Sequence, residues 1–304
     1  MSHDPAALLG PDGVARTSDL VNRVDRHTIS SWVARGRLLR PFPGVVVLPD
    51  AWPDWHCRAL AAVFATDGVL SHGSALGLWR LAPREGAIHV SVPASRRALR
   101  RRGLVVHRVT EVPADRLGRL PVTLLPRSLV DAWGWAHSAR GSGRAVETVR
   151  GAVIEVARDR RLQPSALLLE LSRQPALPGR RALVELIDLV AQGCESELEI
   201  WGVQRVLRGP GMPMFRQQHP VRLPFGEVRL DAAIPELKIA VEMDGAAFHG
   251  SSEARERDLM RDAALAARGW VVLRFSYRRL RRDPEGCRRE ILSVIRERSA
   301  LLLR

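Results

Sequence analysis

Residues 194–304 carry an order of helix and strand patterns that few folds can accommodate. Helical periodicity and extended runs alternate here, with turn residues between them. The expected elements are a helix over 196–207, strands over 215–223, 227–234 and 237–244, a helix over 252–268, a strand over 270–276 and a final helix from 283. Gly269 ends the charged helix, and Pro284 lies in the first turn of the last one. The order α-β-β-β-α-β-α predicts an α/β core with a mixed sheet.

Basic residues outnumber acidic ones, with 47 lysines and arginines against 33 aspartates and glutamates. The formal net charge is +14 and the isoelectric point is near 11.3. Such a charge favours polyanionic partners, because basic side chains release the counterions that are condensed on phosphates. A GC-rich coding sequence would explain arginine in place of lysine, but not the excess of basic over acidic residues. Nucleic acid is therefore the expected partner, ahead of a membrane surface.

No apolar run approaches the ~20 residues that a membrane span needs, so we expect no membrane segment. The N-terminus has Asp4 where a signal peptide would carry positive charge, which favours a cytoplasmic protein. The three cysteines, Cys57, Cys194 and Cys287, lie far apart. An odd number at this spacing argues against a disulfide framework and against a Cys-x-x-Cys zinc site.

The first 50 residues have the pattern of three short helices followed by a hairpin. The third helix, in "DRHTISSWVARGR", puts Ile29, Trp32 and Val33 on one face. Its other face exposes Arg26, His27, Ser30 and Arg35. This arrangement is typical of a winged helix-turn-helix, whose third helix enters a major groove. The alternative is a small helical cap with a polar outer face.

Four parts are expected along the chain: a winged-helix domain over 1–50, an α+β middle domain over 51–140, a helical connector over 141–193 and the α/β domain over 194–304. Three histidines of the middle domain, His72, His89 and His107, fall in different predicted elements. We therefore expect each to be a packed or surface histidine, and the sequence assigns no chemistry to them.

Four chemically active residue types share the stretch "LDAAIPELKIAVEMDGAAFHG". On an extended strand alternate residues share a face, so Lys238, Glu242 and Asp244 would lie together. A turn at "PELK" that pairs the isoleucines on either side of it would set Asp231 opposite Glu242. Cross-strand neighbours have Cβ atoms about 4.5–5.5 Å apart, and two carboxylates this close need a proton or a cation.

Mg²⁺ or Mn²⁺ is the cation that such a pair of carboxylates suits, because hard divalent ions prefer oxygen ligands and share them with phosphate. A bound ion can activate water for phosphodiester hydrolysis. Lys238, the only lysine in the chain, could then orient that water or stabilise developing charge. The alternative is an antiparallel strand with one solvated face.

The segments "CESELEIWG", "RLDAAIPELKIAVEMDGAAFHG" and "RERDLMRDAALAARGWVVLRF" together resemble the endonuclease-like family related to very-short-patch repair nucleases. That family belongs to the PD-(D/E)xK restriction-endonuclease-like superfamily. The resemblance implies that Asp231 and Glu242 are metal ligands and that Glu199 is the helix carboxylate. It also implies that His249 transfers a proton or contacts phosphate, and that Asp258, Arg261 and Asp262 lie on a helix beside the site.

Two features of this chain depart from that resemblance or compete with it. The superfamily's Glu-x-Lys would put lysine at position 244, where this chain has Asp244, so Lys238 is the candidate substitute. Ser196 and Glu199 also match Ser-x-x-Glu, the capping box of a helix start.

The front half resembles AbiEi-type antitoxins of type IV toxin–antitoxin systems. The resemblance rests on residues 13–49, on "LSHGSALGLWRL" and on "LPVTLLPRSLVDA". It implies a winged helix followed by an α+β domain, autorepression, and a cognate toxin as partner. It also implies that the residues facing DNA are Arg26, His27, Thr28, Ser30 and Arg35.

We therefore expect a multidomain α/β protein that binds DNA and hydrolyses its phosphodiesters with a divalent metal. The alternative is a catalytically inactive DNA-binding regulator or antitoxin. A structural partner for a toxin is the third hypothesis.

Overall fold

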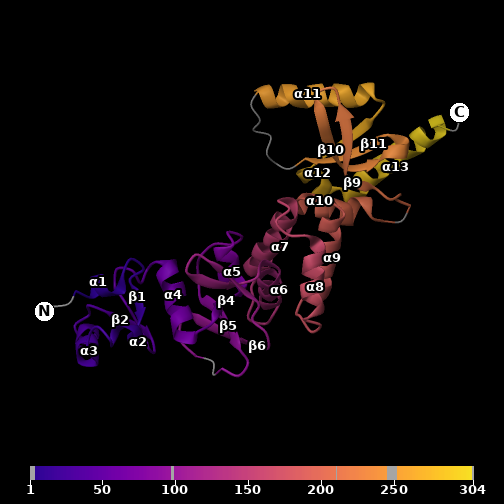
Figure 1. Cartoon of the computed structure of the whole chain (residues 1–304). Coiled ribbons are helices and arrows are strands. Elements are labelled where there is room, and N and C mark those ends of the chain that lie inside the picture. Colours follow the sequence, from indigo (N-terminus) through magenta and orange to yellow (C-terminus); the bar gives the residue numbers. More distant parts are fainter. Residues whose placement is uncertain (1–3, 97–98, 210, 245–251, 303–304) are drawn as a thin grey trace. The chain divides into compact units, whose positions relative to one another are not determined.

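The computed structural model describes residues 4–96, 99–209, 211–244 and 252–302 (Figure 1). The chain divides into two compact units. The first comprises residues 1–153 and 165–184, and the second comprises residues 154–164 and 185–304. Each unit is described by itself below. No helix in the described part of the chain is long and apolar enough to cross a bilayer.

The first unit begins with three short helices and a three-stranded antiparallel sheet of order β1-β3-β2. The elements are α1 (Pro5–Leu9), β1 (Val14–Arg16), α2 (Thr17–Leu20), α3 (Arg26–Ala34), β2 (Leu39–Phe42) and β3 (Val45–Val47). The predicted helices and hairpin are confirmed, and Ile29 and Trp32 are buried as expected. Strand β1 was not predicted, because three residues are too few to show a strand pattern.

A five-stranded sheet of order β6-β5-β4-β8-β7 follows in the same unit. Its elements are α4 (Trp55–Thr66), β4 (Val69–Leu70), α5 (His72–Leu78), β5 (Ile88–Pro93), β6 (Leu104–Val109), β7 (Ala114–Leu117), β8 (Leu120–Thr123) and α6 (Leu125–Ala136). Val45 and Val47 share one hydrophobic cluster with Leu60 of α4 and Val90 of β5. Residues 1–50 and 51–140 therefore have part of their core in common, and the four-part division stays a prediction.

Three helices run through the segment predicted as a connector: α7 (Gly143–Arg158), α8 (Pro164–Ser172) and α9 (Arg180–Ala191). Gly193 follows α9 with φ 106°, a backbone conformation that glycine tolerates and other residues rarely adopt. Buried leucines such as Leu167 and Leu171 hold α8 in the first unit.

Residues 194–304 of the second unit have the predicted order α-β-β-β-α-β-α, with three short additions, η1, η2 and α12. The elements are α10 (Glu197–Gly202), the π-helical turn η1 (Val203–Leu207), β9 (Arg216–Leu223), β10 (Gly226–Ile234), the 3₁₀ turn η2 (Pro235–Leu237), β11 (Ile239–Asp244), α11 (Ser252–Ala267), β12 (Val271–Ser276), α12 (Tyr277–Arg282) and α13 (Pro284–Leu302). The sheet has the order β12-β11-β10-β9, with β11 and β12 parallel and the other pairs antiparallel, so the predicted mixed sheet is confirmed.

Helices cover both faces of this sheet, with α11 on one side and α12 and α13 on the other (Figure 1). Leu265 of α11 shares a hydrophobic cluster with Ala233 of β10 and Ala240 of β11. On the opposite face Gly202 of α10 lies so close to Met243 that a Cβ at Gly202 would come 2.1 Å from its sulfur. The alternative of a strand with one solvated face is therefore wrong.

Strand β12 was expected to be buried, but only Phe275 of it is. The reason is its place at the edge of the sheet, where one side has no neighbouring strand among the described residues.

Candidate functional site

The turn at Pro235 pairs β10 and β11 in the predicted register. Ile234 lies opposite Ile239, and Ala232 lies opposite Val241. The same register, continued by one residue, sets Asp231 against Glu242. The predicted pairing of the isoleucines is therefore confirmed, and it brings these two carboxylate-bearing positions to adjacent strands.

Glu242 is buried, with 5% of its surface exposed, and its carboxylate takes an arginine as partner. Nη2 of Arg261 on α11 donates to Glu242 Oε1 at 2.9 Å and also to the carbonyl of Arg229 at 2.8 Å. A buried carboxylate needs such a partner, because burial without one is costly. The next residue of α11, Asp262, accepts a hydrogen bond from Arg274 of β12.

Asp231 is half-buried, and its Oδ2 accepts a hydrogen bond from the Met243 amide at 2.8 Å. The register of β9 and β10 sets Gln218 on the other side of Asp231, since Leu230 lies opposite His219 and Ala232 opposite Gln217. Gln218 has φ 48°, in the left-handed region, so the edge of the sheet departs from regular geometry beside Asp231.

Glu199 caps the start of α10, as the Ser-x-x-Glu pattern predicts. The Ser196 hydroxyl accepts from the Glu199 amide and donates to its Oε1 at 2.7 Å. Oε2 accepts from the Glu195 amide at 3.0 Å and from Gln218 Nε2 at 3.1 Å. Gln218, which lies opposite Asp231 on the neighbouring strand, therefore also contacts Glu199. Burial raises the pKa of the neighbouring Cys194 thiol to about 12, and the charge of Glu199 adds to the shift.

Lys238 does not lie on the strand face beside Glu242, and that prediction is wrong. The residue precedes β11 in a left-handed conformation with φ 50°, and its Nζ donates to the carbonyl of Arg268 at 2.9 Å. The prediction assumed that the strand begins at Leu237. The chain instead forms a 3₁₀ turn over Pro235–Leu237, so Lys238 does not follow the alternation of the strand. Lys238 precedes Glu242 by four residues. At about 3.3 Å per residue, this puts the two positions roughly 13 Å apart along the chain.

Of the predicted catalytic residues Asp244 and His249, the structure describes only the backbone of Asp244. Asp244 ends β11, and its backbone pairs with Ser276 of β12. His249 lies outside the described residues. Their catalytic roles stay predictions.

The structure gathers three histidines that the sequence left apart. His72, His89 and His107 each offer a nitrogen, and these atoms lie within 4.8 Å of one another. Among the described residues this is the one group of three or more potential metal-ligating side chains at such distances. The expectation of packed histidines is confirmed, since the three rings lie against one another. That they lie together was not predicted. The sequence carries no spacing signal for them, because each comes from a different element.

The rings of the three histidines contact each other and Trp135. His89 Nδ1 and His107 Nε2 lie 3.0 Å apart, and the His72 and His107 rings stack with centroids 3.5 Å apart. Trp135 presents its ring edge-on to all three. Burial lowers the pKa of His89 to about 4 and that of His107 to about 3, and it holds the pKa of His72 well below its usual value. All three imidazoles are therefore neutral at physiological pH.

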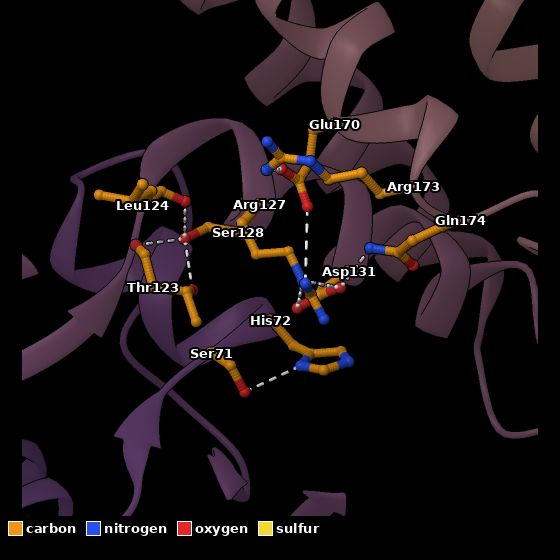
Figure 2. A network of polar contacts seen from close by, with 10 residues as sticks. All are labelled: Ser71, His72, Thr123, Leu124, Arg127, Ser128, Asp131, Glu170, Arg173 and Gln174. Carbon is orange, nitrogen blue, oxygen red and sulfur yellow. Dashed lines mark hydrogen bonds and ion pairs between the residues drawn. The ribbon is translucent and has the colours of Figure 1, made fainter. Parts of the chain in front are cut away.

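A buried polar network adjoins His72 (Figure 2). Nε of Arg127 donates to both carboxylate oxygens of Asp131 at 2.8 Å, and its Nη1 lies 3.5 Å from Glu170 Oε1. Gln174 adds a hydrogen bond to Asp131 at 3.0 Å. Burial raises the pKa of Asp131, while Arg127 acts in the opposite direction. The arginine charge is thus matched by two acidic side chains.

Two cavities open beside the histidines, and Trp135 lines both. One has a volume of about 560 Å³ and is lined by His72, His107, Arg127 and Arg140 among others. The other has a volume of about 280 Å³ and includes His89 in its lining.

On α3 and at Arg35 directly after it, the structure exposes most of the residues predicted to face DNA. They are Arg26, His27, Ser30 and Arg35. Thr28, by contrast, is half-buried, and its hydroxyl donates to Asp25 Oδ2 at 2.7 Å while its amide donates to Oδ1 at 2.9 Å. Thr28 therefore helps to cap the helix, which leaves four exposed candidates.

The chain is similar to two proteins of Mycobacterium tuberculosis, "Uncharacterized protein MT2308" of strain CDC 1551 / Oshkosh and "Uncharacterized protein Rv2248" of strain ATCC 25618 / H37Rv. Each is 27% identical over 266 residues, which cover 85% of this chain and 93% of the relative. Residues 204–295 match the family model REase_MTES_1575, a restriction-endonuclease-like family. This match spans strands β9 to β12, helices α11 and α12 and most of α13. The C-terminal domain is therefore restriction-endonuclease-like.

Proposed function

We propose that the protein binds DNA and that its C-terminal domain hydrolyses DNA phosphodiesters with a divalent metal. The observation that supports the proposal is the pairing of Ile234 with Ile239 inside a restriction-endonuclease-like domain. Continued along the strands, this register would bring Asp231 next to Glu242. Carboxylates on adjacent strands are the oxygen ligands that Mg²⁺ or Mn²⁺ prefers.

The donor set fits such an ion in chemical type, because both candidate ligands are carboxylates and hard divalent ions prefer oxygen. Asp231 and Glu242 would hold the metal. Asp244 would lie in or near its ligand shell, and Glu199 could join only by giving up a hydrogen bond of the α10 cap. The metal would supply Lewis-acid stabilisation of the phosphate and an activated water. Arg261 would have to release Glu242 Oε1, and its guanidinium would then be available to a phosphate oxygen.

The DNA-binding part of the proposal rests on α3 and on net charge. A winged helix whose third helix enters the major groove would use Arg26, His27, Ser30 and Arg35, all exposed. The net charge of +14 would add non-specific affinity that falls with salt concentration.

A supercoiled plasmid tests the cutting. Wild-type protein with Mg²⁺ or Mn²⁺ should nick it, and Asp231→Asn and Glu242→Gln should each abolish nicking with unchanged circular dichroism. Glu236→Gln is the matched control, since Glu236 is exposed and pairs with Arg216 away from these carboxylates. Nicking that survives in both carboxamide variants would contradict the proposal.

A second candidate function is a DNA-binding regulator or antitoxin with a cognate toxin and no cutting activity. The Arg261–Glu242 pair favours it, because a carboxylate already neutralised by arginine has less affinity for a metal. Binding of DNA at every Mg²⁺ or Mn²⁺ concentration without nicking would support this alternative. Its DNA contacts are tested by Arg26→Gln and Arg35→Gln, with the exposed Arg80→Gln as control.

A further inference from the structure

We propose that His72, His89 and His107 bind one divalent transition-metal ion of the kind that prefers nitrogen ligands, such as Zn²⁺ or Co²⁺. The proposal is independent of the cutting proposed for the C-terminal domain. It concerns the first unit alone and a different ligand chemistry, since imidazole suits zinc and cobalt while carboxylate suits magnesium.

The fold brings the three histidines together from separate elements. Strands β5 and β6 pair in parallel, with His89 opposite Val105 and Ser91 opposite His107. The two histidines are thus diagonal neighbours on one face, within reach of long side chains. His72 is the first residue of α5, and its φ of 52° is unusual for a residue with a side chain. Such a conformation needs support from its surroundings.

The nitrogens lie at separations that a common ion can bridge. Zinc–nitrogen bonds of about 2.0–2.1 Å put two ligands of a tetrahedral site roughly 3.3 Å apart. His89 Nδ1 and His107 Nε2 are 3.0 Å apart. His72 Nδ1 lies 2.9 Å from the Ser71 hydroxyl, which leaves its Nε2 for a metal. A hydrogen bond to the second ring nitrogen is what fixes the orientation of metal-ligating histidines.

One ring has to turn for all three lone pairs to meet. The His72 and His107 planes are only 15° apart in their stack, and imidazole lone pairs lie in the ring plane. Rotation about one Cβ–Cγ bond redirects a lone pair, and this torsion is broad in histidine. The neighbouring cavity leaves room for the movement, because His72 and His107 line its wall.

Three protein ligands leave a fourth position open. Structural zinc sites close all four with protein, whereas sites with three protein ligands keep one for water or a substrate. The cavity of about 560 Å³ adjoins His72 and His107, so an exogenous ligand can reach the ion. Arg140 lines the same cavity, and Arg127 is already balanced by Asp131 and Glu170. Water or a small anion is the ligand that this setting favours.

Metal titration of the full-length, chelator-treated protein tests the site. We expect one equivalent of Zn²⁺ to bind, and Co²⁺ to give the visible absorption of a four-coordinate nitrogen site. His89→Gln and His107→Gln should each weaken Zn²⁺ binding at least ~10-fold. His56→Gln, at a histidine of the same unit outside the cluster, is the matched control and should bind Zn²⁺ like the wild type. Equal binding by the wild type and both cluster variants would overturn the proposal.

A measurement on the wild type alone tests the site even if the histidine variants fail to fold. X-ray absorption at the zinc edge should show about three imidazole ligands at roughly 2.0–2.1 Å. A coordination sphere of oxygen only would exclude the histidines. Asp231→Asn combined with Glu242→Gln should leave this signal intact while it removes nicking, so the two proposals succeed or fail separately.

Discussion

Arg261 on α11 and Glu242 on β11 form a largely buried ion pair, with 2.9 Å between Nη2 and Oε1. The exposed fractions of the two side chains are 23% and 6%. The pair joins the covering helix to the strand that carries the candidate ligand. It therefore has a structural role whether or not the domain cuts DNA.

Arg261→Gln should lower the free energy of unfolding by about 2–3 kcal/mol, because it removes the arginine charge beside the buried carboxylate of Glu242. Mg²⁺ should recover part of this loss, since Glu242 no longer shares its carboxylate with an arginine. Urea unfolding with and without Mg²⁺ measures both effects. Arg274→Gln breaks the more exposed pair with Asp262 and should cost less than about 1 kcal/mol. An absence of any Mg²⁺ effect on Arg261→Gln would count against the metal site.

Lys238→Met should leave nicking unchanged. Its ammonium donates a hydrogen bond to the carbonyl of Arg268 after the end of α11, away from Glu242. We expect a stability loss of about 1 kcal/mol, the usual contribution of one hydrogen bond. A plasmid assay and a thermal melt check the two parts. Loss of nicking in a folded Lys238→Met variant would restore the catalytic role that strand alternation suggested.

Gly202→Ala should destabilise the second unit by about 1–3 kcal/mol through overpacking, since the added methyl group meets the sulfur of Met243. Combining it with Met243→Ala should give a coupling energy of roughly 0.5–3 kcal/mol in a double-mutant cycle. Gly151→Ala on α7 is the control, because nothing lies within 4 Å of its added Cβ. That control should be neutral or stabilising by about 0.5–1 kcal/mol.

The cap of α3 should make the N-terminal helices sensitive to acid. Hydrogen bonds from Thr28, its hydroxyl first and its amide second, lower the pKa of Asp25 below 3.8. The stabilisation is then complete above the ordinary pKa and is lost as the pH falls through the lower pKa of the folded state. Asp25→Ser keeps a capping oxygen that does not titrate.

Thermal melts between about pH 5 and pH 2.5 compare the two proteins. The midpoint of the wild type should fall more steeply than that of Asp25→Ser. Parallel curves would show that the Asp25 carboxylate contributes nothing specific to the helix.

The sequence determined the elements of the C-terminal domain because its signals there are local. Apolar runs of strand length, Gly269 after α11 and Pro284 in the first turn of α13 act within a few residues. The pairing of Ile234 with Ile239 was equally predictable, since a tight turn fixes the register of the strands beside it.

Tertiary structure alone decided what each polar group meets. A 3₁₀ turn redirected Lys238 toward Arg268, and α11 brought Arg261 to Glu242 from 19 residues along the chain. His72, His89 and His107 meet only because β5 pairs with β6 and α5 packs against β5. Distant contacts of this kind depend on how elements pack, and packing leaves no periodic trace in the order of residues.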